Sequence, residues 1–334
     1  MPITSRDVAV MAGVSQPTVS RALRGDPRVS AATRARVLRA AEALGYVTHE
    51  AGRSLATRRT HRIGVVLTDL GNPFYPHLVG PLHDELARLG YQMTMLTERS
   101  ERALLNERLV DGSLDGAVLM TATLDSVLPA ELTRRGFPFV FLNRDAATGG
   151  DAAVVENEAG GRLAADFLVS LGHRHIGALF GPRSTATGRD RELGFRLGLA
   201  EHGIAVPADA ARYGAFEFRT GHALLEEVLA ARPQPTAVFC GGDAIALGAL
   251  NAALAAGIDV PGQVSVIGFD DIPMASWEAF RLTTVSYDLV QMVAGACRLL
   301  TERIEDAQVR SAAPRRLTYA PSLVERNTHA AAGA

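Results

Sequence analysis

Two groups of residues in this chain carry side chains suited to specific binding. The first lies near the N-terminus, in VAVMAGVSQPTVSR (8–21), where Gln16, Ser20 and Arg21 can hydrogen-bond to bases and phosphates. The second includes Arg191 and Asp270, which together can hold vicinal hydroxyl groups. The two groups indicate binding of a nucleic acid and of a small polar molecule.

The sequence carries no recognisable catalytic pattern. A P-loop of the form G-x-x-x-x-G-K-[ST] cannot occur in a chain without Lys, and no Gly-x-Ser-x-Gly or Cys/His arrangement indicates a nucleophile. His173 and His175 are closely spaced, but the neighbouring sequence offers them no acidic or Cys partner. We therefore expect no enzyme activity, no cofactor and no metal site.

The N-terminal stretch has the signals of a helix-turn-helix. Thr4 and Asp7 suit a capping-box-like start for a first helix, and Gly13 can end it in a left-handed conformation. Ser15 can then cap a second helix that begins at Gln16. The second helix would present its polar face to DNA.

A third helix is expected between Ser30, a suitable N-terminal cap, and Gly45, a suitable stop. Three short helices around a small apolar centre would make a self-contained DNA-binding unit. The apolar residues expected at this centre are Ala9, Met11, Ala12, Val19, Leu23, Val37, Leu38, Ala41 and Leu44.

Charge is distributed unevenly along the chain. Residues 1–60 hold ten Arg and four acidic residues, a net charge of +6, so the remainder carries −8 of the total of −2. A basic head on an acidic body favours a polyanionic partner for the head alone. All 34 basic residues are Arg.

The rest of the chain alternates between short apolar runs and helical stretches. Runs at 62–67, 91–96, 116–120 and 139–142 form one series, and HIGALFG (175–181), TAVFCGG (236–242) and VSVIGFD (264–270) form another. Alternating strands and helices imply parallel sheets, so two series predict an α/β body with two doubly wound lobes.

Ligands of open α/β sheets bind beyond the carboxyl ends of the strands. Polar and aromatic residues that follow the expected strands are therefore the candidates for a small-molecule site. In the first lobe they are Asp69, Asn72, Phe74, Tyr75, Thr121, Asn143 and Arg144, and in the second Arg191, Phe216, Gly242, Asp243, Asp270 and Asp271. Each could instead be a helix cap or a core aromatic.

The head resembles the LacI/GalR family of bacterial transcription regulators. The similar residues are DVAVMAGVSQPTVSRAL and PRVSAATRARVLRAAEALGY, with further matches along nearly the whole chain. The resemblance implies that the second helix enters the major groove and that Gln16, Pro17 and Arg21 read bases. Pro17 has no side-chain hydrogen bond to offer, so it would act by contact and shape. The DNA-binding candidates in the head are Thr4, Ser15, Gln16, Pro17, Thr18, Ser20 and Arg21.

The same resemblance assigns a hinge helix to HEAGRSLATRR (49–59). In the family this helix orders on the operator and inserts a Leu into the minor groove. That role falls here to Leu55, with Arg53, Arg58 and Arg59 near phosphates. Gly52 and Glu50 depart from the usual pattern. Both favour a hinge that is disordered off DNA.

For the body, the resemblance implies the two-lobed shape of periplasmic sugar-binding proteins. It supports Arg191 and Asp270 as polar anchors and Phe216 as the stacking aromatic, with other effector-binding candidates around them. These are Asn72, Phe74, Tyr75, Thr121, Asn143 and Gly242. Gly242 stands where the family often has Asn, so the ligand cannot be transferred from a relative. Asp243 is expected to cap the following helix.

We predict the following domains. Residues 1–48 form the helix-turn-helix domain, 49–60 the hinge and 61–328 the effector-binding and dimerisation domain. Lobe 1 takes 61–156 and 286–316, including a helix over 286–304, and lobe 2 takes 157–285 and 317–328. Residues 329–334 would form a frayed tail.

These features predict a cytoplasmic repressor that binds double-stranded operator DNA and a sugar-like effector. Only Cys240 and Cys297 are present, and no signal peptide or membrane span is evident. No heptad repeat follows Val324, which favours a homodimer over a tetramer. The alternative is a sugar-binding protein without DNA function, against which the basic head and the missing signal peptide count.

Overall fold

The computed structural model describes residues 3–23, 25–46, 59–67, 71–97, 101–107, 109, 111–147 and 149–333. The chain divides into two compact units, residues 1–60 and 61–334, called the head and the body below. In the described parts, no helix is both long and apolar enough to cross a membrane.

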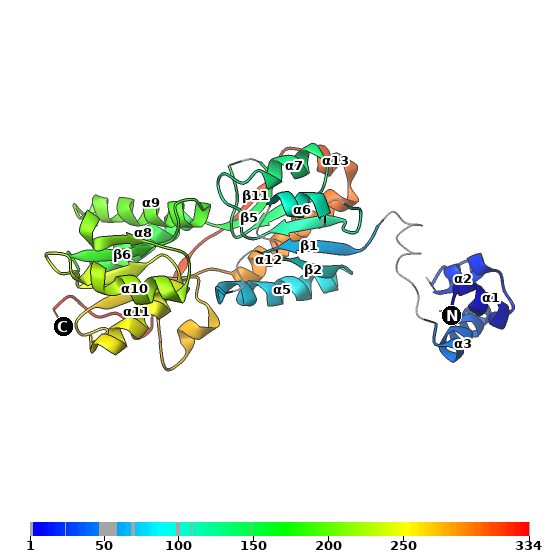
Figure 1. Cartoon of the computed structure of the whole chain (residues 1–334), viewed down its shortest axis with the longest axis horizontal. Helices are drawn as coiled ribbons and strands as arrows, with labels where there is room; N and C mark the ends of the chain where they lie inside the picture. Colours follow the sequence, from blue (N-terminus) through cyan, green and yellow to red (C-terminus); the bar gives the residue numbers. More distant parts are fainter. Residues whose placement is uncertain are drawn as a thin grey trace. The chain divides into compact units, whose positions relative to one another are not determined.

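The described residues of the head form three short helices around one apolar centre (Figure 1). The helices are α1 (Ser5–Ala12), α2 (Gln16–Leu23) and α3 (Ala31–Leu44). Each contributes one fully buried valine to the centre, namely Val8, Val19 and Val37. The predicted helix-turn-helix with a third supporting helix is confirmed.

The helix ends follow the expected caps. The backbone N–H of Thr4 donates to the Asp7 carboxylate at 2.8 Å, and Ser30 Oγ accepts a backbone N–H of α3 at 3.2 Å. Gly13 and Gly45 end their helices with φ of 60° and 62°. These are left-handed conformations that glycine adopts without strain.

Two residues expected at the centre of the head are instead on its surface. Met11 and Leu38 are 56% and 49% exposed. Helices this short bury only a narrow stripe, and these side chains lie beside it rather than on it.

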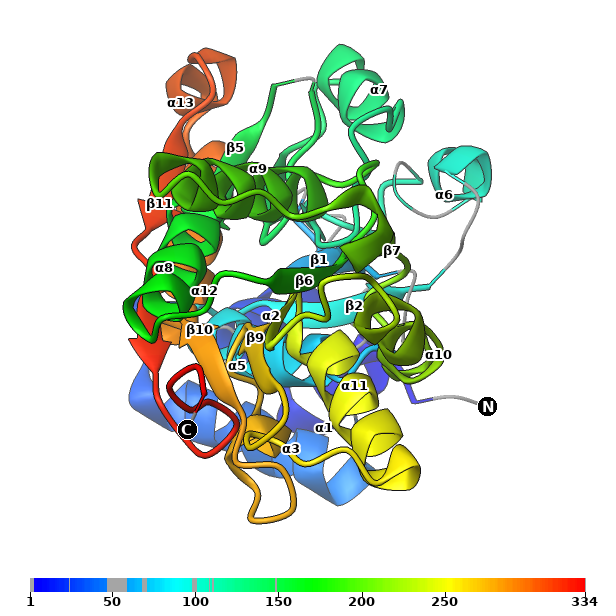
Figure 2. The same cartoon turned by 90° about the vertical axis from the view of Figure 1, so that its left-hand side faces the viewer.

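The described body contains two six-stranded sheets, one in each lobe (Figures 1 and 2). The strands of the first are β1 (Arg62–Val66), β2 (Gln92–Leu96), β3 (Gly116–Leu119), β4 (Phe139–Leu142), β5 (Asp151–Val155) and β11 (Arg316–Tyr319). Those of the second are β6 (Ile176–Phe180), β7 (Ala211–Tyr213), β8 (Ala237–Cys240), β9 (Ser265–Phe269), β10 (Thr283–Ser286) and β12 (Ser322–Val324). The strand orders are β11-β5-β4-β3-β1-β2 and β12-β10-β9-β8-β6-β7. All pairs are parallel except β10 with β12, as two doubly wound lobes require.

Helices cover both faces of each sheet. In the first lobe, α5 (Phe74–Arg88) and α12 (Leu289–Glu305) cover one face, while α6 (Glu101–Glu107) and α7 (Leu128–Arg134) cover the other (Figure 1). In the second lobe, α8 (Asn157–Ser170) and α9 (Ala186–Glu201) lie opposite α10 (Phe218–Leu229) and α11 (Asp243–Ala256). The remaining short pieces are α13 (Ala307–Ser311) and the helical turns Ala208–Ala210 and Pro273–Ser276. Both sheets are thereby buried on both faces.

The last strands divide differently from the prediction. β11 pairs with β5, with Leu317 opposite Ala153, so residues 317–319 belong to the first lobe and not to the second. Only β12 reaches the second sheet. Leu317 and Tyr319 pack against the apolar core. The helix expected over 286–304 does return to the first lobe, but it begins at Leu289 because Ser286 ends β10.

The predicted frayed tail is wrong for the described residues 329–333, which pack on the second lobe. His329 Nδ1 lies 2.8 Å from Thr283 Oγ1, and the Ala332 N–H donates to the Leu171 carbonyl at 2.9 Å. The Ala330 carbonyl lies 3.1 Å from His173 Nε2. His173, singled out for its spacing, is therefore a structural residue that holds this segment.

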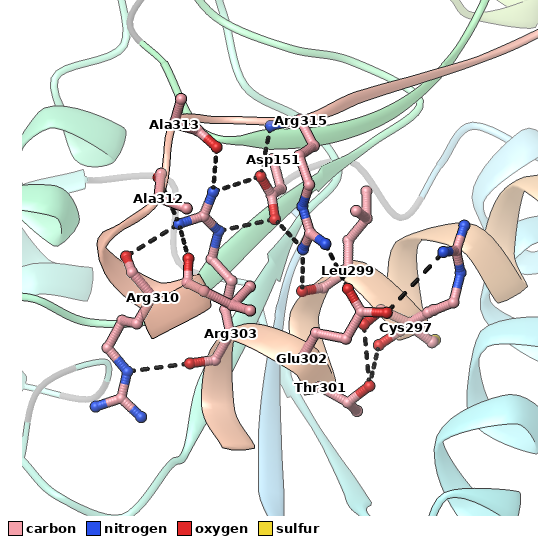
Figure 3. Close-up of polar contacts among 12 residues, drawn as sticks. Asp151, Cys297, Leu299, Thr301, Glu302, Arg303, Arg310, Ala312, Ala313 and Arg315 are labelled. Atoms are coloured by element: carbon pink, nitrogen blue, oxygen red, sulfur yellow. Dashed lines mark hydrogen bonds and ion pairs between the residues drawn. The ribbon is translucent and has the colours of Figure 1, made fainter. Parts of the chain in front are cut away.

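A buried ion-pair network fixes the end of the first lobe from which β5 starts (Figure 3). The Asp151 side chain is fully buried, and Arg303 of α12 donates to both its oxygens at 2.7 Å. Arg315, just before β11, donates from its backbone N–H at 2.7 Å and from Nη2 at 2.9 Å. Arg303 also donates to the carbonyls of Ala312 and Ala313. The network therefore ties β5, α12 and β11 together.

Candidate functional site

The exposed face of α2 is the candidate DNA-binding surface of the head. Gln16, Pro17, Ser20 and Arg21 are exposed, whereas Val19 between them is fully buried. The solvent-facing side of α2 therefore carries hydrogen-bonding side chains and the cation Arg21, while its apolar residues pack against the rest of the head.

The other head candidates stabilise the helix ends. Ser15 Oγ accepts the Thr18 backbone N–H at 3.4 Å and lies 2.8 Å from the Thr18 hydroxyl. Gln16 Nε2 donates to Ser5 Oγ at 2.9 Å, which joins α2 to α1. Hydrogen bonds from the backbone and hydroxyl of Thr4 lower the pKa of Asp7. Three further DNA-binding candidates, Arg53, Leu55 and Arg58, lie outside the described residues, so their roles stay predictions.

Arg191 is the centre of the candidate effector site in the body. It lies on α9, is 2% exposed, and stacks its guanidinium 3.7 Å from the centroid of the Phe269 ring. Its Nε donates to Asn157 Oδ1 and its Nη1 to the Gly241 carbonyl, both at 2.8 Å. These contacts fix the plane of the guanidinium.

Asp270 completes this arrangement from the carboxyl end of β9. Its oxygens accept hydrogen bonds from Arg191 at 2.7 and 3.2 Å and from the Tyr287 hydroxyl at 3.2 Å. Its φ of 112° lies in the region that favours glycine, so the backbone is strained where it turns the carboxylate toward Arg191. Backbone strain of this kind clusters at ligand-binding and active sites.

Phe216 packs against the glycines that follow β6 and β8. A Cβ at Gly181 would lie 2.1 Å from its ring, and one at Gly242 would lie 2.9 Å away. The Gly242 that distinguishes this sequence therefore makes room for Phe216. The ring is 6% exposed, and its faces meet Arg191 of the same lobe and Arg144 of the first lobe.

The first lobe contributes residues from two strand ends. Asn143, after β4, is 3% exposed with φ of 72°, and its Oδ1 has no hydrogen-bond partner among the described residues. Asn72 Oδ1 accepts the Phe74 N–H at 3.0 Å and so supports the start of α5. Phe74 and Tyr75 are buried in the core, and Thr121 is half-buried after β3.

Asp243 differs from its predicted role as a helix cap. It is the first residue of α11, and its carboxylate accepts the Ile272 N–H at 2.9 Å and the Thr284 hydroxyl at 2.5 Å. Complete burial raises the pKa of Asp243 well above its ordinary value, and the charge of Asp270 adds to the effect. Asp243 thus joins α11 to β10 beneath the site.

Asn157 and Tyr287 were missed by the sequence analysis, although both bind the Arg191–Asp270 pair directly. They lie where the chain crosses between the lobes, Asn157 at the start of α8 and Tyr287 just before α12. The sequence could have indicated them only through their position, because a segment that crosses between the lobes must pass the strand ends that face each other. Asn157 also lines a surface cavity of about 850 Å³ together with Arg162, Arg189 and Arg316. This cavity includes none of the predicted effector residues.

The two lobes touch at the site. The Leu124 N–H of the first lobe donates to the Ser184 carbonyl of the second at 2.8 Å. The Arg144 guanidinium lies 5.0 Å from the Phe216 ring centroid. The structure thus brings Arg191, Asp270, Phe216 and Gly242 together and sets Arg144 against them from the first lobe.

Comparison with known proteins extends over both units. Residues 4–49 match "Bacterial regulatory proteins, lacI family", and residues 165–329 match "Periplasmic binding protein-like domain". The HTH-type transcriptional regulator CelR of Thermobifida fusca is 34% identical over 307 residues, which cover 89% of this chain and 90% of CelR. The ribose operon repressor of Escherichia coli is 31% identical over 332 residues, with 97% and 99% covered.

Solved structures give the same result. The lac repressor dimer bound to operator and the anti-inducer ONPF has a TM-score of 0.87 at 29% identity, covering 99% of this chain and 100% of that one. A complex of the regulator CelR with cellobiose has a TM-score of 0.74 at 32% identity, with 98% and 99% covered. The chain belongs to the LacI family of bacterial regulatory proteins.

Proposed function

We propose that the protein is a transcription repressor whose affinity for an operator changes when a sugar or sugar derivative binds between its lobes. The observation that carries this proposal is the buried Arg191–Asp270 pair, which is hydrogen-bonded by Asn157 and Tyr287 from two of the crossovers between the lobes. A site built on the crossovers senses the angle between the lobes directly.

The proposed mechanism is linkage between two binding sites. A ligand that binds one lobe arrangement more tightly than another shifts the population toward it, and only this difference in affinity can change operator binding. Coupling free energies of about 1–3 kcal/mol are typical of such systems. Relatives support a carbohydrate effector, because one is named for the ribose operon and another was solved with cellobiose.

DNA binding is assigned to α2 and the hinge. Gln16 and Arg21 would hydrogen-bond to base edges, Pro17 would select by shape, and Leu55 would enter the central minor groove. Such a regulator works where the chromosome is, in the cytoplasm.

We assign homodimerisation to the second lobe. Leu254 on α11 and Trp277 after the Pro273–Ser276 turn are 79% and 54% exposed. Large apolar side chains in this position suit contact with a second copy, and a two-fold dimer matches a pseudo-palindromic operator. Sedimentation of a Leu254→Glu, Trp277→Glu variant tests this assignment, which predicts a shift toward monomer.

A gel-shift experiment decides between this function and a sugar-binding protein without DNA function. The full chain is incubated with DNA from upstream of its own gene and with unrelated DNA of equal length. Selective retardation of the upstream DNA supports the repressor. Absence of a shift, with and without candidate sugars, would refute it.

A further inference from the structure

Two buried polar atoms beside the candidate effector site lack partners. Asn143 Oδ1 and Arg144 Nε, from consecutive residues after β4, are covered from solvent and make no hydrogen bond to any described residue. Buried polar groups without partners are rare and energetically costly. Their adjacency points to a ligand that supplies both an acceptor and a donor.

Arg144 contacts aromatic faces rather than acids. Its guanidinium lies 5.0 Å from the ring centroid of Phe216 and 5.9 Å from that of Tyr75. The neighbouring carboxylate of Asp145 pairs with Arg316 instead. Cation–π contacts orient the guanidinium but do not neutralise its charge.

The other charges around the site balance one another. Arg191 pairs with Asp270 and Asp271 with Arg326, each at 2.7 Å. Burial lowers the pKa of His77 below its ordinary value of 6.5, although the charges of Asp270 and Asp271 oppose this effect, so this histidine is mostly neutral at pH 7. Burial raises the pKa of Asp243 beneath the site, which favours its neutral form. Among the described residues, Arg144 is therefore the cation of the site that no acid pairs with.

Building on the function proposed above, we infer that the effector is an anionic carbohydrate derivative, a sugar acid or a phosphosugar, whose negative group pairs with Arg144. A hydroxyl next to that group donates to Asn143 Oδ1, while Arg191 and Asp270 hold hydroxyls at the other end. A neutral sugar would leave the half-buried Arg144 guanidinium without a counter-charge and its buried Nε without an acceptor. An anion instead gains a charge-assisted pair with geometric specificity.

The test measures ligand affinity of the full chain by calorimetry. Each neutral sugar is compared with an anionic counterpart. Glucose is compared with glucuronate and with glucose 6-phosphate, galactose with galacturonate, and ribose with ribose 5-phosphate. Cellobiose is added as a neutral disaccharide. Carboxylate and phosphate probes separate the two sources of negative charge.

Three variants accompany the wild-type chain. Arg144→Gln removes the charge, and Arg144→Lys keeps it without the guanidinium. Arg134→Gln is the matched control, since Arg134 is an exposed residue of α7, ahead of β4 in the same lobe. Thermal melting of each variant shows that it is folded.

The inference predicts that an anionic probe binds more tightly than its neutral parent. Arg144→Gln should weaken that binding about 10- to 100-fold, the range of a lost charged hydrogen bond. Arg144→Lys should recover part of it, and Arg134→Gln should leave it unchanged.

Equal binding of neutral and anionic probes, or equal affinity in the folded Arg144→Gln variant, would overturn the inference. If no anionic probe binds at concentrations up to about 10 mM, which would detect even a Kd in the millimolar range, the inference is overturned as well. Operator binding is measured in parallel without ligand. If operator binding persists while the calorimetry contradicts the inference, the effector class is wrong and the repressor assignment stands.

Discussion

Arg191 Nη2 lies 2.7 Å from Asp270 Oδ1, although 79 residues separate the two in the sequence. Both side chains are at least nine-tenths buried, and each is held by a residue of a lobe crossover. We therefore expect a change in the lobe angle to disturb this pair, which is the connection proposed here between ligand binding and operator binding.

Breaking this pair should cost stability as well as ligand response. Arg191→Met leaves the Asp270 charge buried without its partner, so the free energy of unfolding should fall by about 3–5 kcal/mol. Urea denaturation measures the change. An Arg189→Met variant, altered at a side chain that is about half exposed on the same helix, serves as control. A loss below about 1 kcal/mol, the value of a surface ion pair, would contradict the buried geometry.

Gly242 should be required for the position of Phe216. In Gly242→Asn the new side chain meets the Phe216 ring, since even its Cβ would lie 2.9 Å away, and overpacking of this kind costs about 1–3 kcal/mol. Adding Phe216→Leu should recover part of that loss. Strictly additive effects in this double-mutant cycle would mean that the two residues do not compete for space.

Stability should depend on pH through Asp151. Burial opposes its ionisation, but the hydrogen bonds from Arg303 and Arg315 outweigh this effect and hold the pKa of Asp151 below its ordinary value. A lowered folded-state pKa contributes stability above the unfolded value of about 4, and this contribution is lost as the pH falls through the folded-state pKa.

The Asp151→Asn variant tests this linkage. It should be less stable than the wild type at pH 7 by about 3 kcal/mol, as for a broken buried ion pair. The difference should shrink as the pH falls below about 4, because Asp151 then binds a proton in the unfolded wild type but stays ionised in the folded state until its lowered pKa is reached. A difference that stays constant from pH 7 down to about 3 would exclude Asp151 as the source.

The hinge prediction rests on Leu55. Leu55→Ala should weaken specific operator binding, because the wedge that kinks the central minor groove step is removed, while ligand affinity stays the same. Fluorescence anisotropy with labelled operator and calorimetry with ligand measure the two separately. Unchanged operator affinity would refute the wedge assignment.

Local chemistry made the head predictable. The pair Thr4–Asp7, the glycines at 13 and 45 and the cap at Ser30 act within a few residues, so the sequence alone places the helix ends. Burial was less predictable. Met11 and Leu38 are apolar at nearly the right spacing, yet both are exposed because the three-helix centre is narrow.

In the body, sequence patterns predicted the sheets but not every tertiary contact. The alternation of strands and helices along the sequence predicted the two sheets and the ends of their strands. The rule that ligands bind beyond the carboxyl ends of strands then grouped Arg191 with Asp270. The pattern could not tell that β11 joins the first sheet, because an edge strand is chosen by tertiary pairing rather than by its own residues. Nor could it show that Asp243 supports β10 instead of capping α11, since that depends on the distant Thr284.

Operator affinity measured with and without ligand tests most directly whether ligand binding changes operator binding. Anisotropy titrations of the full chain on operator DNA, in the absence of ligand and at a saturating concentration of the best-binding probe, give the coupling. We expect the ligand to change the operator Kd by about 5- to 150-fold and the folded Arg191→Met variant to show no such change. An operator Kd that is the same with saturating ligand as without it would contradict the claim.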